Sequence, residues 1–338
     1  MILVFGAAGF LGTYLIEELL ESHYPILAAD VDGIGKDYYE RRGVRFECMD
    51  ITQKEDFQRF ENEDIEAVVN LACVQPANVS REQYDPVSYI KVNVIGTLNI
   101  LEFCRESKIS KVIAATSHRN TKGLWKGGKK IREEEGRAIE FFGEYAMFSI
   151  SESAAEDCIE YYNRAYGLQG IILRLPPVYG YGPHTVIFKN GRETKTGFQT
   201  FIDNVASGKQ IEIWGNPDIG RDIIYVKDVV RAFVLALDSH AARGLYNISS
   251  GRALSLRKQV EETLKAFGRD MREYPIVFRP EKKNSVEPFV YDNGKAEKEL
   301  GWTPKYSFAE LLIDYKREME IGRFDYLITK RKRMFTKE

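Results

Sequence analysis

The chain has 338 residues, 44% of them hydrophobic, which is enough to bury one large core or a core with a smaller lobe. A net charge of −2 gives no electrostatic reason to expect nucleic acid or an anionic membrane as a partner. No apolar run approaches the roughly 18 residues of a membrane span. A strand pattern that begins at residue 2 leaves no room for a signal peptide, so we expect a cytoplasmic protein.

Short apolar strands alternate with helical patterns along the first half of the chain. Strands are expected at 2–5, 25–29, 44–48, 67–71, 111–115 and 170–175, and helices at about 11–20, 86–107 and 148–166. This alternation predicts right-handed crossovers and a Rossmann-like α/β fold with a doubly wound parallel sheet.

After Pro176-Pro177 the sequence changes to loops rich in Gly, Pro and polar residues, which predicts a smaller lobe over the carboxyl ends of the strands. We expect one domain to comprise residues 1–175 with about 222–250, and the lobe to comprise about 176–221 and 251–338. The basic run Lys330-Arg331-Lys332-Arg333 indicates a solvated terminus more than an interaction tail.

The cysteines and histidines give no sign of a metal site or of disulfides. Cys48, Cys73, Cys104 and Cys158 show no C-x-x-C spacing and lie in apolar surroundings. This pattern favours buried thiols in a reducing compartment, and the histidines show no zinc spacing.

A glycine motif stands between the first strand and the first helix. It reads Gly6-Ala7-Ala8-Gly9-Phe10-Leu11-Gly12, with the spacing G-x-x-G-x-x-G. Glycines at such a turn let the backbone approach a pyrophosphate, which is held by free N–H groups at the start of the helix. Gly6, Gly9, Phe10, Leu11 and Gly12 are therefore candidate dinucleotide-binding residues.

Asp30 ends the second strand and predicts the choice of cofactor. A carboxylate there can accept hydrogen bonds from the adenosine ribose and repel a 2′-phosphate. The nearest following basic residue is Lys36, so we expect NAD rather than NADP. A turn aspartate without a cofactor role is the alternative.

An ordered series of further motifs extends to the end of the chain. The motifs are Asn70-Leu71-Ala72-Cys73, Asn93-Val94-Ile95-Gly96-Thr97, Leu173-Arg174, Val178-Tyr179-Gly180, Arg221-Asp222-Ile223-Ile224-Tyr225-Val226-Lys227-Asp228-Val229, Gly244-Leu245-Tyr246-Asn247-Ile248 and Leu300-Gly301-Trp302-Thr303-Pro304. Together with the glycine motif, this series resembles the extended short-chain dehydrogenase/reductases of the NAD-dependent epimerase/dehydratase type, which act on nucleotide sugars.

The resemblance implies sites for both ligands. Further residues that it places at NAD are Asp50, Ile51, Leu71 and Ala72. Asp50 could equally cap the helix that follows, and one residue can do both. The resemblance places Arg221 on a substrate phosphate and Tyr179 beside the substrate. His184 lies in the loop that follows and is expected to face the same substrate site. The alternative is an ordinary loop histidine without a binding role.

The catalytic pair of that family is replaced in this chain. Members carry a Tyr that moves the proton, and a Lys one helical turn later that holds the nicotinamide ribose and lowers the pKa of the Tyr. The segment 148–156 aligns without a gap and places Phe148 and Glu152 at these two positions. Phe has no proton to transfer, and a carboxylate cannot lower the pKa of a phenol by its charge.

Three other residues could take part in proton transfer. The resemblance places Ser117 against the sugar hydroxyl. His118 follows it, and we expect it to be the stronger proton acceptor because imidazole titrates near neutrality, although a structural histidine is the alternative. Tyr145 lies one helical turn before Phe148, but its i+4 partner is Ser149 rather than a lysine. Arg119 and the lysines after it could clamp an anionic group or be solvated.

Three functions remain open from the sequence. The first is an NAD-dependent nucleotide-sugar epimerase or oxidoreductase with different acid–base residues. The second is a catalytically degenerate protein that binds NAD and a nucleotide sugar, and the third is a reductase of a non-nucleotide substrate.

The resemblance also implies a homodimer that pairs through the helices at 86–107 and 148–166. Residues at helical spacing that could form the apolar seams are Ile90, Val94, Leu98, Leu101, Ile159 and Tyr162. Burial of these side chains within one protomer is the alternative.

Overall fold

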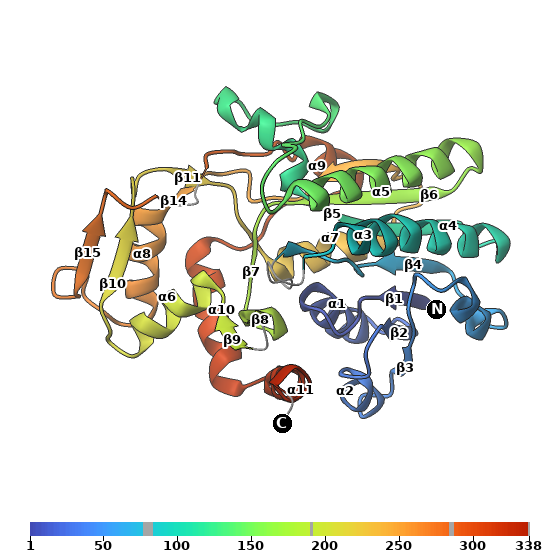
Figure 1. Ribbon diagram of the computed structural model, residues 1–338, viewed down its shortest axis with the longest axis horizontal. Helices are drawn as coiled ribbons and strands as arrows, with labels where there is room; N and C mark the ends of the chain where they lie inside the picture. Colours follow the sequence, from blue (N-terminus) through green and yellow to red (C-terminus); the bar gives the residue numbers. More distant parts are fainter. Residues whose placement is uncertain (77–83, 190–191, 284–286, 337–338) are drawn as a thin grey trace.

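Seven parallel strands form one sheet at the centre of the molecule. The computed structural model describes residues 1–76, 84–189, 192–283 and 287–336. The sheet order is β13-β6-β5-β4-β1-β2-β3 (Figure 1). The strands are β1 (Ile2–Phe5), β2 (Ile26–Asp30), β3 (Arg45–Cys48), β4 (Ala67–Asn70), β5 (Lys111–Ser117), β6 (Gln169–Leu175) and β13 (Gly244–Asn247). This confirms the predicted fold class, and the strand order reverses at β1, where such sheets bind ligands.

Helices cover both faces of this sheet, so each strand contributes to two cores. Leu3 and Phe5 pack toward one face with α3 (Pro86–Tyr89), α4 (Thr97–Glu106) and α5 (Ala146–Ala165) nearby. Ile2 and Val4 pack toward the other face with α1 (Phe10–Glu21) and α7 (Val226–Asp238). Burial on both faces explains why these strands are continuous apolar runs and not alternating ones.

The helix predicted at 86–107 is divided by a π-helical segment, η3 (Ile90–Gly96). Asn93 in this segment accepts a hydrogen bond from the Val74 N–H at 2.8 Å and donates to Ser151 Oγ at 3.0 Å. The side chain of Asn93 therefore joins α5 to the loop after β4. In the same segment, Gly96 lies so close to Ile51 that an added Cβ would be 2.5 Å from Ile51 Cδ1.

A group of small sheets lies beside the carboxyl ends of the central strands (Figure 1). The pairs are β7 (Val178–Tyr179) with β12 (Ile224–Tyr225), β8 (Val186–Lys189) with β9 (Arg192–Lys195), β10 (Ile211–Trp214) with β15 (Ile276–Arg279), and β11 (Gly220–Arg221) with β14 (Leu254–Ser255). Helices α6 (Gly197–Ala206) and α8 (Leu256–Ala266) enclose a separate small core around Ile211 and Val260. The exact domain division stays a prediction, because Trp302 also packs in the larger core.

The remaining helices join these parts. They are α2 (Lys36–Glu40), α9 (Gly294–Leu300), α10 (Phe308–Ile321) and α11 (Asp325–Thr336), with 3₁₀ segments η1 (Lys54–Phe60), η4 (His118–Gly127), η5 (Glu133–Glu135) and η6 (Pro183–Thr185). The basic run at 330–333 lies within α11 and is therefore helical, and Arg331 is half-buried, which corrects the expectation of a solvated terminus. Over the described ranges, no helix is long and apolar enough to cross a membrane.

The four cysteines are free thiols, but they are not uniformly buried. Cys104 is buried, whereas Cys48 and Cys73 are exposed. The prediction of buried thiols is wrong for these two, because Cys48 ends the edge strand β3 and Cys73 lies in the loop after β4. Cys48 Sγ lies 3.3 Å from the carbonyl oxygen of Val31.

Candidate active site

The turn between β1 and α1 packs backbone against backbone. Gly6 has a φ of +75°, and a Cβ on it would lie 2.6 Å from the amide nitrogen of Ala72. A Cβ on Gly12 would lie 2.2 Å from the carbonyl oxygen of Gly6. Gly9 is the N-cap of α1 and provides no side chain to cap the first N–H groups. Those N–H groups therefore remain suited to an anionic ligand.

Asp30 is held at the end of β2 with its carboxylate against this loop. Its Oδ2 accepts a hydrogen bond from the Ala8 N–H at 2.8 Å, and its Oδ1 accepts one from the Val31 N–H at 2.8 Å. Burial, and then the charge of Asp32, raises the pKa of Asp30 to about 6. At pH 7 the carboxylate is largely ionised and retains lone pairs for ribose hydroxyls.

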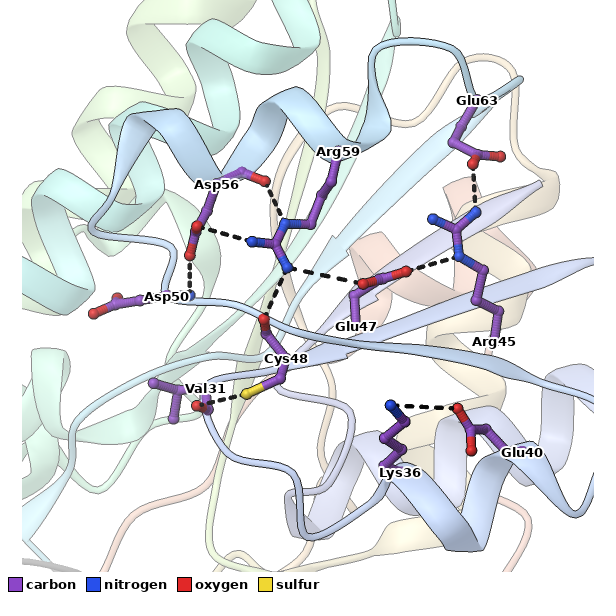
Figure 2. Close-up of polar contacts among 10 residues, drawn as sticks. All are labelled: Val31, Lys36, Glu40, Arg45, Glu47, Cys48, Asp50, Asp56, Arg59 and Glu63. Carbon is purple, nitrogen blue, oxygen red and sulfur yellow. Dashed lines mark hydrogen bonds and ion pairs between the residues drawn. The ribbon is translucent and has the colours of Figure 1, made fainter.

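The cations near the ends of β2 and β3 already have protein partners, as Figure 2 shows. Lys36 forms an ion pair with Glu40 at 3.9 Å. Arg59 donates to the carbonyl oxygen of Cys48 at 3.0 Å and to Asp56 Oδ1 at 3.0 Å. Lys36 and Arg59 are thus both engaged by other protein groups, which agrees with NAD as the cofactor.

The other predicted cofactor residues meet at the same edge of the sheet. Leu71 and Ala72 follow β4, and their backbone touches Gly6. The carboxylate of Asp50 accepts the N–H of Thr52 at 2.9 Å, so it closes the turn before η1. Ile51 is buried against Gly96. The loops after β1, β2, β3 and β4 thus converge.

The start of α5 holds the family's two catalytic positions. Phe148 and Glu152 are both buried on the inner face of this helix. Burial, and then the charge of Glu156, raises the pKa of Glu152 to about 8. Glu156 accepts hydrogen bonds from Thr116 Oγ1 at 2.5 Å and Asn120 Nδ2 at 2.7 Å. Glu152 is therefore a neutral carboxylic acid at pH 7, with a proton to donate but no positive charge.

His118 lies in an aromatic stack next to Ser117. Its ring is 5.4 Å from Phe289 and 5.7 Å from Trp125, measured between ring centroids. Nδ1 lies 3.2 Å from the carbonyl oxygen of Leu175. Burial, and then the charges of Arg119 and Arg221, lowers the pKa of His118 well below 6.5. The imidazole is therefore neutral and a weaker base than the sequence predicted.

Tyr145 has a cationic partner that sequence spacing does not reveal. The guanidinium carbon of Arg119 lies 3.9 Å from the centroid of the Tyr145 ring. Arg119 is the second residue of η4, the segment that begins directly after Ser117. Tyr145 is the N-cap residue of α5. Arg119 directly follows His118 in the chain, and Tyr145 is itself a predicted catalytic residue. The fold therefore places a cation beside Tyr145, which its i+4 residue Ser149 does not provide.

The three predicted substrate residues are spread over this mouth. Arg221 lies on β11, and its buried Nε has no hydrogen-bond partner within the described segments. Tyr179 on β7 stacks on Phe198, with ring centroids 4.2 Å apart. His184 on η6 stacks on Phe10 of the glycine loop, with ring centroids 3.5 Å apart. His184 is thus on the cofactor side of the mouth, and its substrate role stays a prediction.

Comparison with known proteins decides the family. The model of the NAD dependent epimerase/dehydratase family matches residues 2–249. The chain belongs to this family. UDP-glucuronate 4-epimerase of Thermodesulfobacterium geofontis is 27% identical over 322 residues, which cover 91% of this chain and 92% of that protein. The chain thus belongs to a family of NAD-dependent enzymes, and the glycine turn with Asp30 fits that cofactor.

Solved structures agree over nearly the whole length. UDP-glucose 4-epimerase of Thermotoga maritima, solved with UDP-glucose, has a TM-score of 0.77 and 28% identity, covering 95% of this chain and 99% of that one. UDP-glucose 4-epimerase of Thermus thermophilus, solved with NAD, has a TM-score of 0.74 and 26% identity, covering 94% and 98%. These likenesses include the lobe after β6.

Proposed function

We propose that this protein is an NAD-dependent nucleotide-sugar epimerase in which Tyr145, supported by Arg119, replaces the missing Tyr–Lys pair. The observation that carries this proposal is the 3.9 Å approach of the Arg119 guanidinium to the Tyr145 ring. The names of the relatives, two UDP-glucose 4-epimerases and a UDP-glucuronate 4-epimerase, support a UDP-sugar as substrate.

Epimerisation at a carbinol carbon needs a group that takes the hydroxyl proton and later returns it. Bound NAD supplies the acceptor and donor of the hydride. Ser117, at the end of β5, would orient the sugar hydroxyl, and the Tyr145 oxygen would accept its proton. A guanidinium over the ring stabilises the negative charge that develops on the phenol during this transfer.

Glu152 would keep one of the two tasks of the lost lysine. Because its carboxyl is protonated at neutral pH, it can donate a hydrogen bond to a nicotinamide ribose hydroxyl. It cannot supply the positive charge, which in this proposal comes from Arg119. The two tasks of one lysine are then divided between two residues on different elements.

The test is turnover of a panel of UDP-sugars by purified variants. We expect Tyr145→Phe to lower kcat by about 100-fold or more, the usual size of a general-base contribution. Arg119→Gln should lower it comparably, whereas His118→Phe should retain most activity. Tyr161→Phe, an exposed tyrosine on α5, is the matched control. Unchanged turnover in Tyr145→Phe would exclude the proposal.

A binding role without catalysis is the second candidate, and the burial of Phe148 and neutral Glu152 favours it. The two candidates differ in one measurable product. An epimerase oxidises the nucleotide sugar transiently and so reduces its bound NAD. The absorbance of the reduced nicotinamide detects this step. Binding of UDP-sugars without any reduced cofactor, and without a new epimer, would favour the binding role.

Phe148→Tyr with Glu152→Lys restores the family's pair and tests the same geometry from the other side. If the position of the sugar is unchanged, this double variant should raise turnover. The single variant Glu152→Lys separates the effect of the positive charge from that of the phenol, because it restores the ammonium beside Glu156 and leaves Phe148 in place.

A further inference from the structure

Helix α11 brings a cation from the far end of the chain to the glycine loop. The Arg331 Nη2 group donates a hydrogen bond to the carbonyl oxygen of Ala8 at 3.2 Å. Ala8 precedes Gly9, the N-cap of α1, so the guanidinium lies one residue from the free N–H groups of that helix. Arg331 Nε is buried and has no hydrogen-bond partner within the part of the chain that the structure describes.

A second orphaned nitrogen lies beside the same loop. The His184 ring stacks on Phe10 with an interplanar angle of 24°, and its Nδ1 is buried without a hydrogen-bond partner among the described residues. Burial of a polar nitrogen atom without a partner is costly and calls for an explanation, and a bound ligand is one such explanation. Both orphaned nitrogens flank residues 8–10, where the family binds a dinucleotide.

Arg331 is not needed to hold α11 in place. The Tyr326 hydroxyl donates to Asp37 at 2.7 Å, and Lys330 forms an ion pair with the same carboxylate at 3.0 Å. At the start of the helix, the Tyr181 hydroxyl donates to Asp325 at 3.0 Å. The apolar side chains Phe324, Leu327 and Ile328 are buried in the main core. The helix is therefore fixed at several points before Arg331 reaches the loop.

We propose that Arg331 is a cofactor-binding residue that closes the site over the pyrophosphate of the dinucleotide. A guanidinium offers five N–H donors in a planar fork that matches phosphate oxygens, and its charge complements the N-terminus of α1. The ionised Asp30 carboxylate accompanies it on the ribose side and repels a 2′-phosphate. We therefore expect Arg331 to bind the bridging pyrophosphate, because Asp30 disfavours a phosphate on the ribose. His184 forms an uncharged wall against Phe10.

The experiment uses the full-length protein and measures affinity by titration calorimetry with NAD, ADP, adenosine and NADP. Arg331→Gln should weaken NAD and ADP by about tenfold to a hundredfold, the size of a hydrogen bond to a charged group, and leave adenosine unchanged. Arg331→Lys should keep part of the affinity. The control is Arg333→Gln, which removes the same charge from an exposed position on α11.

Three outcomes would overturn the proposal. If Arg331→Gln binds NAD as tightly as the wild type does, and likewise ADP, Arg331 is not part of the binding site. An equal loss for adenosine would assign it a structural role, which a lowered melting temperature would accompany. A loss confined to NADP would assign it to the 2′-phosphate. Because none of these measurements depends on turnover, the proposal is independent of the catalytic role of Tyr145.

Discussion

Glu152 shows how one buried carboxyl can change the chemistry of an inherited site. It occupies the position of a cation, yet burial beside Glu156 keeps it protonated, so the site contains a neutral donor and not an anion. This burial has a consequence for stability. A carboxyl whose pKa is raised from 4.5 in the unfolded chain to about 8 in the folded protein favours folding less as pH rises between those values.

Glu152→Gln should remove this pH dependence, because an amide of the same shape does not ionise. Below about pH 4 the side chain at this position is neutral in the folded and unfolded states of both proteins, and their melting temperatures should be similar. As pH rises toward 8, the wild type should lose stability relative to Glu152→Gln. Thermal melts from pH 5 to 8 measure this difference, with exposed Glu134→Gln as control. A constant difference across that range would contradict a protonated Glu152.

Asp30 should select the cofactor in a pH-dependent manner. Its pKa of about 6 means that the repelling charge is present above that pH and is lost below it. We expect wild type to bind NAD more tightly than NADP at pH 7.5, and this preference to shrink at pH 5. Asp30→Ala should weaken NAD by about tenfold and narrow the preference at both pH values. Equal binding of both cofactors by wild type at pH 7.5 would count against the assignment.

At the scale of elements, the β1–α1 turn depends on the absence of a Cβ. Gly12→Ala places a methyl group 2.2 Å from the carbonyl oxygen of Gly6, which forces the loop to open. We expect this variant to lose NAD binding and to melt at a lower temperature. Gly197→Ala at the start of α6 is the control, since nothing lies within 4 Å of the added Cβ. Normal NAD affinity in Gly12→Ala would show that the turn is more adaptable than its contacts indicate.

The strands and main helices were predictable because hydrophobic burial leaves a local pattern in the sequence, which is a continuous apolar run in each strand and a spacing of about 3.6 residues in each helix. The glycine turn and Asp30 were predictable for a similar reason, since both belong to one strand–helix–strand unit, β1–α1–β2. Arg119 beside Tyr145 and Arg331 beside Ala8 were not predictable. In each pair the two residues are distant in sequence. A local sequence pattern does not predict which distant cation the fold places beside a site.

At the scale of the whole molecule, part of the predicted dimer seam, on η3 and α4, is not fully buried within the protomer. Of the residues predicted for the dimer seams, Leu101, Ile159 and Tyr162 are buried within the protomer. Ile90, Val94 and Leu98 are only half-buried, and Ile95 is 43% exposed. The segments η3 and α4 both contact α5, so these residues adjoin one helical surface. The protomer thus uses part of the predicted seam and leaves part uncovered.

We expect a homodimer at micromolar concentration that is weakened by Ile95→Glu, because a carboxylate would be buried at the partner's surface. Analytical ultracentrifugation measures the change. Ile313→Glu on α10, where the native side chain is 62% exposed, introduces the same charge on a different surface and should leave the assembly intact. A wild-type protein that sediments only as a monomer would contradict the homodimer.

The contact between Arg331 and Ala8 joins residues 323 positions apart. On the ribosome, the glycine turn emerges early, but its guanidinium partner leaves the exit tunnel only after the rest of both domains has been synthesised. The hydrogen bond between Arg331 and Ala8 can therefore form only after α11 has been synthesised and has docked against the glycine loop.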